Sequence, residues 1–138
     1  MWSKRQSLLI DQLCVVSNIQ NSATSVKGQF ALLVDDVAIS LLPGRADDSI
    51  CVVVQLGQPT KNLELLSYKR LLELNLVLDQ SNRQRMAIDP VTGAALLIFE
   101  IFPIDTTHVL ISLQRAAACA KSWQQDHFLD PQSMKEVA

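Results

Sequence analysis

The chain has 138 residues, the length of a single domain, and a hydrophobic share of 49% that can fill one core. Its net charge of -2 gives no electrostatic footprint for DNA or RNA and argues against a nucleic-acid-binding protein. The apolar run at Leu8 is cut short by Asp11, so it predicts no signal peptide, and no stretch reaches the ~20 apolar residues of a membrane span.

The first predicted element is a helix that Ser3 caps and that extends to about Gln20. Its apolar residues wrap well past the ~100° stripe that suffices for packing on a sheet. The second apolar face either lies under the chain's own last helix or stays partly open for a partner. The two faces are formed by Leu9, Leu13 and Val16 and by Leu8, Val15 and Ile19.

Three strands are expected next, after a polar connector at residues 21–27. Apolar residues alternate over 29–34 and 37–41 on either side of a tight turn at Asp35-Asp36. A loop with Gly44 precedes a third strand over 49–56, whose two faces are both apolar. A strand of that kind lies centrally in a sheet or has a covered outer face.

The next helix, capped by Thr60, carries two apolar stripes where one would suffice for packing on its own sheet. The surplus stripe needs a cover, and in a domain this small we expect a second copy of the chain. We therefore predict a homodimer. The stripes are Leu63, Leu71, Leu74 and Leu78, and Leu65, Tyr68, Leu72 and Leu76; the predicted dimer interface comprises Leu65, Tyr68, Leu72, Leu74 and Leu76.

A second hairpin is predicted over 84–88 and 94–102, with Gly93 supplying a positive φ in the turn. Asp105 or Thr106 caps a third helix that reaches about Gln125 and has one ordinary stripe anchored by Trp123. The predicted fold class is α+β: a mainly antiparallel twisted sheet of about five strands with three helices, in the order α-β-β-β-α-β-β-α. Residues 3–125 form the single domain, and 126–138 a flexible tail.

No catalytic, cofactor or metal constellation can be assembled from the sequence. Neither His108 nor His127 has a ligand partner at helical spacing, and the glycines form no phosphate loop. The three cysteines have no CxxC spacing and are expected to be buried free thiols in a reducing cytosol. We therefore predict no enzyme.

The order of motifs resembles the class I chaperones of bacterial type III secretion, the CesT/Tir-chaperone family. The leucine pair Leu71-Leu72 precedes Asn75, and the short strand Ala87-Ile88-Asp89 leads to a turn with Gly93. An aliphatic strand then closes at Pro103. The resemblance extends from roughly residue 4 to 125 and depends on order and spacing, because each piece alone is common.

The resemblance implies a homodimeric, ATP-independent bacterial chaperone of the cytoplasm. Such a protein holds the N-terminal segment of a secreted effector in extended form and keeps it competent for secretion during virulence. The resemblance leaves open whether the protein also binds the secretion ATPase. No nucleic acid or membrane partner is expected. A small ligand-binding domain or enzyme with an apolar pocket is the alternative. The expected effector-binding residues are Leu8, Val15, Ile19, Phe30, Leu32 and Leu33.

Overall fold

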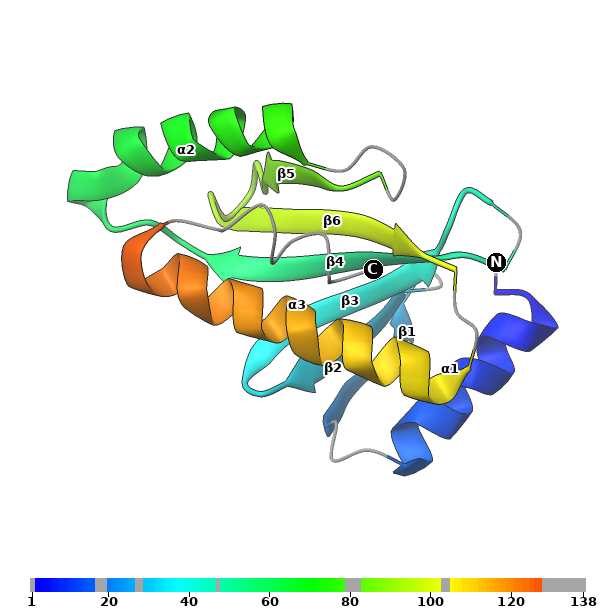
Figure 1. Cartoon of the computed structure of the whole chain (residues 1–138). Helices are drawn as coiled ribbons and strands as arrows, with labels where there is room; N and C mark the ends of the chain where they lie inside the picture. Colours follow the sequence, from blue (N-terminus) through cyan, green and yellow to red (C-terminus); the bar gives the residue numbers. More distant parts are fainter. Residues whose placement is uncertain are drawn as a thin grey trace.

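The computed structural model describes residues 2–16, 20–26, 29–46, 48–78, 83–102 and 105–127, with side chains for all of these except 13–16 and 20–26. Helices and strands follow one another in the order shown in Figure 1. The elements are α1 (Lys4–Val16), β1 (Gln20–Val26), β2 (Gln29–Val34), β3 (Val37–Pro43), β4 (Ile50–Gly57), a 3-10 turn (Lys61–Leu63), α2 (Glu64–Val77), β5 (Arg85–Ile88), β6 (Ala95–Ile101) and α3 (Thr106–Asp126).

The described strands form one six-stranded antiparallel sheet in the order β1-β2-β3-β4-β6-β5. The α+β class and the antiparallel sheet are confirmed. The additional strand is β1, which occupies the stretch predicted to be a polar connector. An edge strand has one neighbour and needs no alternating apolar face, so a search for hydrophobic periodicity passes over it.

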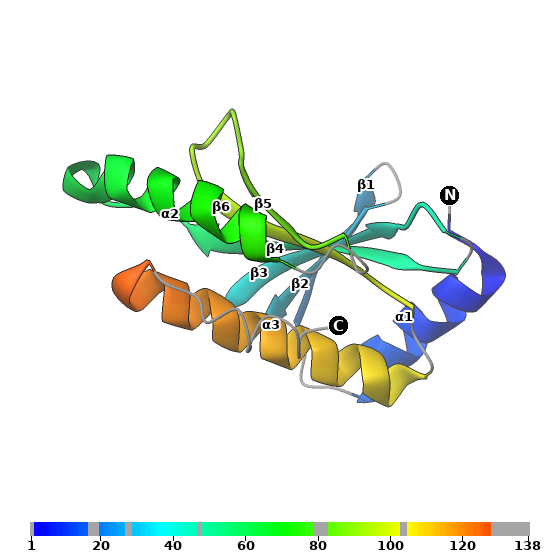
Figure 2. The same cartoon turned by 45° about the horizontal axis from the view of Figure 1, so that its top comes forward.

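All three helices contribute to a core on one side of the sheet. The long helix α3 contacts β2, β3 and β4, α1 packs against α3, and α2 runs along β5 at one edge. Figure 2 shows α1 and α3 together beneath the strands and α2 beside β5 and β6. The largest fully buried side chains come from α3 and from inward-facing positions of the strands; they are Trp123, Phe99, Leu32, Ile39, Leu41, Ile50, Leu56, Leu97, Ile101 and Leu113.

Two tight turns follow the predicted chemistry. Asp35 and Asp36 both have positive φ, 49° and 66°, and join the paired residues Val34 and Val37. Two successive left-handed residues match the twist of a two-residue hairpin, and aspartate tolerates that conformation better than most side chains. Gly93 has φ 77°, as expected for the turn between β5 and β6.

The helix ends agree with the sequence in part. The Ser3 hydroxyl accepts from the Gln6 amide at 3.1 Å, and the Gln6 side chain accepts from the Ser3 amide at 2.7 Å, so the predicted cap forms with a reciprocal bond. Asp105 caps α3 by accepting from the His108 amide at 2.8 Å. The expectation for Thr60 was wrong, because a 3-10 turn intervenes before α2 and Thr60 makes no side-chain cap bond.

The first helix is shorter than predicted, because Gln20, its predicted last residue, belongs to β1; the helix is described as far as Val16. Val15 and Val16 are β-branched, and such residues lower helix propensity at the described end of α1. Of the predicted tail, Asp126 ends α3 and His127 caps it with φ 56°. The rest, 128–138, lies outside the described residues.

Candidate functional site

The outer face of α2 is the most exposed apolar surface of the described chain. Leu65, Leu72 and Leu76 are exposed to 86%, 73% and 88%, and their spacing places them along one line of the helix. Lys69 lies on the same line, where it pairs with Glu73 at 3.9 Å in the solvent. The surplus stripe predicted from the sequence therefore exists as uncovered surface on the single subunit.

The opposite face of α2 belongs to the subunit's own core. Leu71, Leu74 and Leu78 are buried there, with Leu74 only 7% exposed. Leu74 was predicted to lie in the dimer interface, and the structure instead uses it inside the subunit. Tyr68, from the same prediction, is half-buried and packs against the core.

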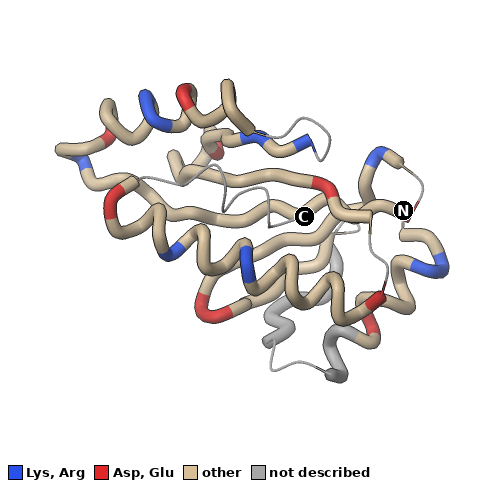
Figure 3. The backbone as a smooth tube through the Cα atoms, in the orientation of Figure 1, with Lys and Arg blue, Asp and Glu red and all other residues tan. Residues whose placement is uncertain are grey.

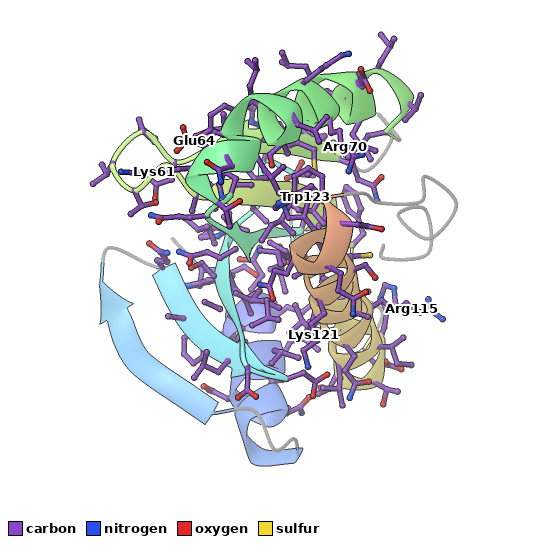
Figure 4. The ribbon with its side chains drawn as sticks, turned by 90° about the vertical axis from the view of Figure 1, so that its left-hand side faces the viewer. Lys61, Glu64, Arg70, Arg115, Lys121 and Trp123 are labelled. Carbon is purple, nitrogen blue, oxygen red and sulfur yellow. The ribbon has the colours of Figure 1, made fainter. Side chains whose placement is uncertain are left out.

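The middle of α2 is also tied to the end of α3. The guanidinium of Arg70 donates to the backbone oxygen of Asp126, one of the last carbonyls of α3. A cation at that position satisfies the carbonyl and complements the helix dipole. Figure 4 shows Arg70 on α2 above the end of α3, with Trp123 below it on the side of α3 that faces the sheet. The inner face of α2 is thus held in place while its outer face stays open.

Asn75, the asparagine that follows the leucine pair Leu71-Leu72, forms hydrogen bonds with the edge strand β5. The Asn75 side chain accepts from the Met86 amide at 2.6 Å and donates to the Met86 carbonyl at 3.1 Å. It therefore meets both outward-facing groups of that residue as a neighbouring strand would. An edge strand with satisfied main-chain groups resists pairing with another chain.

Replacing Asn75 with alanine is expected to lower the free energy of unfolding by about 1–2 kcal/mol, because two hydrogen bonds are lost. The amide of Met86 should also exchange with solvent faster, which hydrogen-exchange mass spectrometry or NMR would measure. Asn62→Ala, at an exposed position in the 3-10 turn, is the control and should change neither quantity. Unchanged protection at Met86 in Asn75→Ala would contradict the role in edge closure.

The predicted effector-binding residues do not share one surface. Leu8 on α1 is 57% exposed, whereas Leu32 is buried in the core. Phe30 is half-buried against the core on the helix side of the sheet, and Leu33 points to the other face. The side chain of Val15 and the whole of Ile19 lie outside the described residues. Leu8 is therefore the member that the structure places on accessible surface.

The face of the sheet away from α3 is a second apolar surface that sequence reasoning did not single out. Its positions alternate with the core positions, and Figure 4 shows α3 on one side of the strands with no drawn helix over the other. The apolar strands on both faces were noted in the sequence, and that signal could have found it. Its half-buried aliphatic and thiol side chains are Leu33, Leu42, Cys51, Val53, Leu96 and Ile98.

A buried carboxylate organises one corner of that face. Glu100 is 4% exposed, and its Oε1 accepts from the Arg45 amide at 2.7 Å and from the Ser49 hydroxyl at 3.3 Å. The guanidinium of Arg83 reaches its Oε2 at 3.1 Å. An isolated buried charge is costly, and here each oxygen has a partner. The sequence signal was an acid inside the aliphatic run of β6.

The loop at that corner also connects the sheet to α1. Ser3 donates from its hydroxyl to Asp48 at 2.7 Å, and the Gln6 side chain donates to the Ser49 carbonyl. Gly44 is required for this packing, because a Cβ there would lie 1.9 Å from the Ser49 hydroxyl and 2.7 Å from Glu100 Oε1. The start of α1, the loop and β6 thus form one connected unit.

The thiols and histidines were expected to carry no chemistry. Burial raises the pKa of the Cys51 thiol; the charges of Arg85 and Arg45 lower it, while Glu100 adds to the rise. A thiol with a raised pKa is a poor nucleophile at neutral pH. Cys119 is buried and forms no disulfide, and Cys14 lies where side chains are not described. Across the described part of the chain, no three His, Cys, Asp or Glu side chains are grouped to hold a metal ion.

Among the described residues, the antiparallel α+β domain has one helix face and one sheet face that are apolar and uncovered, and such surfaces are typical of proteins that bind other polypeptides. The helices in the described segments are too short or too polar for a membrane span. The family model of the Tir chaperone protein (CesT) family matches residues 9–114, and the chain belongs to this family. The class I type III secretion chaperone resemblance is thereby confirmed.

Among solved structures, the chain is similar to a chain of the structure of the HopA1-SchA chaperone-effector complex. The identity is 14% and the TM-score 0.55, with 91% of this chain and 96% of the other covered. At that identity the likeness shows a shared fold. No curated protein matches the sequence significantly.

Proposed function

We propose that the protein is a homodimeric, ATP-independent chaperone that binds the N-terminal segment of a type III secreted effector in extended form. The observation that carries the proposal is the combination of family membership with apolar surface left open on α1, α2 and the sheet. The chaperone would act in the bacterial cytoplasm and keep the effector stable and competent for secretion.

The outer stripe of α2 supports the dimer. Burying Leu65, Leu72 and Leu76 would contribute about 5–9 kcal/mol per subunit at ~1.5–3 kcal/mol for each leucine, and the same again from the partner. Association costs roughly 4–15 kcal/mol, so the gain from two such stripes is comparable to that cost or larger. An isologous contact between two copies of α2 is the simplest arrangement, since each stripe then covers its twin.

The remaining apolar surface supports the client site. A disordered segment gains little affinity per unit area and must cover a wide surface with several shallow contacts. Leu8 on α1 and the outer face of the sheet provide such contacts. The free edge at β1 could add a client strand through main-chain hydrogen bonds, with little demand on client sequence.

The alternative of a small-molecule site finds less support. Such sites are concave, mostly apolar and enclose most of their ligand. One cavity of the described residues, at the Glu100 corner, does not have this form, because it is open and three of its five lining residues are arginines: Arg45, Asn75, Arg83, Gln84 and Arg85.

Replacing Leu8 with aspartate is expected to abolish recovery of the client while leaving the dimer and the fold unchanged. The test is co-purification of the tagged chain from the native cytosol, followed by limited proteolysis of the complex and mass spectrometry. We expect one larger secreted protein, protected from the protease near its N-terminus. Ser7→Asp is the control, because Ser7 is the exposed polar neighbour of Leu8 on α1. Equal client recovery with Leu8→Asp would remove α1 from the site, and absence of any such client would refute the function.

A further inference from the structure

A cavity of about 430 Å³ opens at the corner where β5, β6 and the loop after β3 lie together. It is lined by three arginines and two amide side chains, Arg45, Arg83, Arg85, Asn75 and Gln84. Arginine keeps its charge throughout the ordinary pH range, so the cavity carries three permanent positive charges. In Figure 3 the basic stretches of β5 and of the β3–β4 loop lie around the acidic stretch of β6. The chain as a whole has a net charge of -2, so this positive corner runs against its overall charge.

One carboxylate does not balance this cluster. Glu100 pairs with Arg83, but its contact with Arg45 is made by the backbone amide and not by the guanidinium. Arg85 donates from Nη1 to the Arg83 carbonyl at 3.2 Å, and within the described ranges no carboxylate forms an ion pair with it. Among the described residues, Arg45 and Arg85 therefore each present a guanidinium with no carboxylate partner.

A purely structural role accounts for only part of this arrangement. The Glu100–Arg83 pair fixes the loop and the start of β5, and it holds Arg83 at φ 53°, where a non-glycine residue is uncommon. Neither Arg45 nor Arg85 is needed for that bond. Two further like charges placed on one cavity repel each other, and an anion bound between them would relieve the repulsion.

The cavity is continuous with the apolar outer face of the sheet. Arg85 is paired with Ile98, which is paired with Val53, and Glu100 is paired with Cys51, so these side chains project from one face. A client segment that lies along this apolar face would therefore place one of its side chains beside the three arginines. The planar guanidinium matches a carboxylate through two parallel hydrogen bonds.

We infer that the Arg45–Arg83–Arg85 cavity binds a carboxylate side chain of the client, next to aliphatic client residues on the outer face of the sheet. This inference rests on the proposed function and deepens it, because it assigns a chemical requirement to the client segment. One acidic client side chain bound in the cavity would fix the position of an extended client along the sheet. Apolar contacts alone would let the client slide along it.

The test uses two acetylated and amidated peptides with the same short aliphatic sequence, one with a single glutamate and the other with glutamine in its place. Each is titrated into the full chain while the backbone and arginine Nε–H signals are followed by NMR. We expect the glutamate peptide to shift the signals of Arg45, Arg83 and Arg85 and to bind about fivefold tighter or better. The difference should shrink as salt is added, because screening weakens exposed charge pairs.

Arg45→Gln combined with Arg85→Gln is expected to erase the difference between the peptides without unfolding the chain, since neither guanidinium bonds to Glu100. Arg115→Gln, on the exposed side of α3, is the matched control and should preserve it (Figure 4). Equal binding of the two peptides, or shifts confined to other residues, would overturn the inference. So would inorganic phosphate that competes at the same concentration as the glutamate peptide, because it would mark a site for small anions. None of these results depends on recovery of a client from the cytosol, so the inference can fail while the proposed function stands.

Discussion

Replacing Leu72 and Leu76 together with aspartate is expected to dissociate the proposed dimer into folded monomers, with a dissociation constant raised at least about 100-fold. Both side chains stand in solvent on the single subunit, so charge there costs the fold little. In a dimer the four new carboxylates would be buried against apolar surface and against one another. Light scattering coupled to size-exclusion chromatography would measure the mass, and circular dichroism would check the fold.

The neighbouring residue on the same helix provides the contrasting control. Leu71→Asp places a charge in the subunit's own core and should unfold the chain instead of producing a folded monomer. Asn62→Asp, in the exposed 3-10 turn, should leave the dimer intact. If the Leu72 and Leu76 double variant remained a dimer of unchanged affinity, the outer stripe of α2 would not be the dimer interface.

Replacing Trp123 with alanine is expected to lower the free energy of unfolding by about 3–5 kcal/mol, which is a large share of the ~5–15 kcal/mol typical of a domain. Trp123 is 1% exposed on the inner face of α3, and its ring meets that of His127 edge-on at 5.5 Å between centroids. The substitution removes that contact and leaves a cavity between α3 and the sheet. Urea titration followed by circular dichroism, at one fixed protein concentration, would measure the change.

Lys121→Ala is the control for that measurement, because Lys121 lies on the exposed side of the same helix. We expect its effect to stay within about 0.5 kcal/mol. A loss below about 1 kcal/mol for Trp123→Ala would contradict the assignment of Trp123 as the anchor between α3 and the sheet.

The fold was predictable where apolar periodicity marks an element. The alternation of apolar residues over β2, β3 and β4 indicates which side chains face the core. The leucine spacing in α2 likewise indicates its two apolar stripes. The sequence could not say which α2 stripe faces inward, because both are leucine-rich and the choice depends on the rest of the fold. This is why Leu74 was assigned to the interface although it lies in the core. Strand β1 was missed because its sequence is polar.

The candidate site was less predictable than the fold, for a physical reason. Leu8 could be assigned from one helix alone, and the structure leaves it exposed. The arginine cavity needs residues from the β3–β4 loop, the start of β5 and α2, which are brought together only by strand pairing. The alternation of apolar residues shows that Leu32 and Leu33 face opposite sides of the sheet. It does not show which of the two sides the helices cover, because that depends on the register of the sheet.

The bond between Asn75 and Met86 has a consequence for how many polypeptides one subunit can take up by strand addition. A sheet with two open ends could be extended in both directions, and such growth leads from one molecule to the next and toward fibres. Because Asn75 occupies the outward-facing groups of Met86 at the β5 end, we expect extension at the β1 end. We therefore expect one added strand for each copy of the chain.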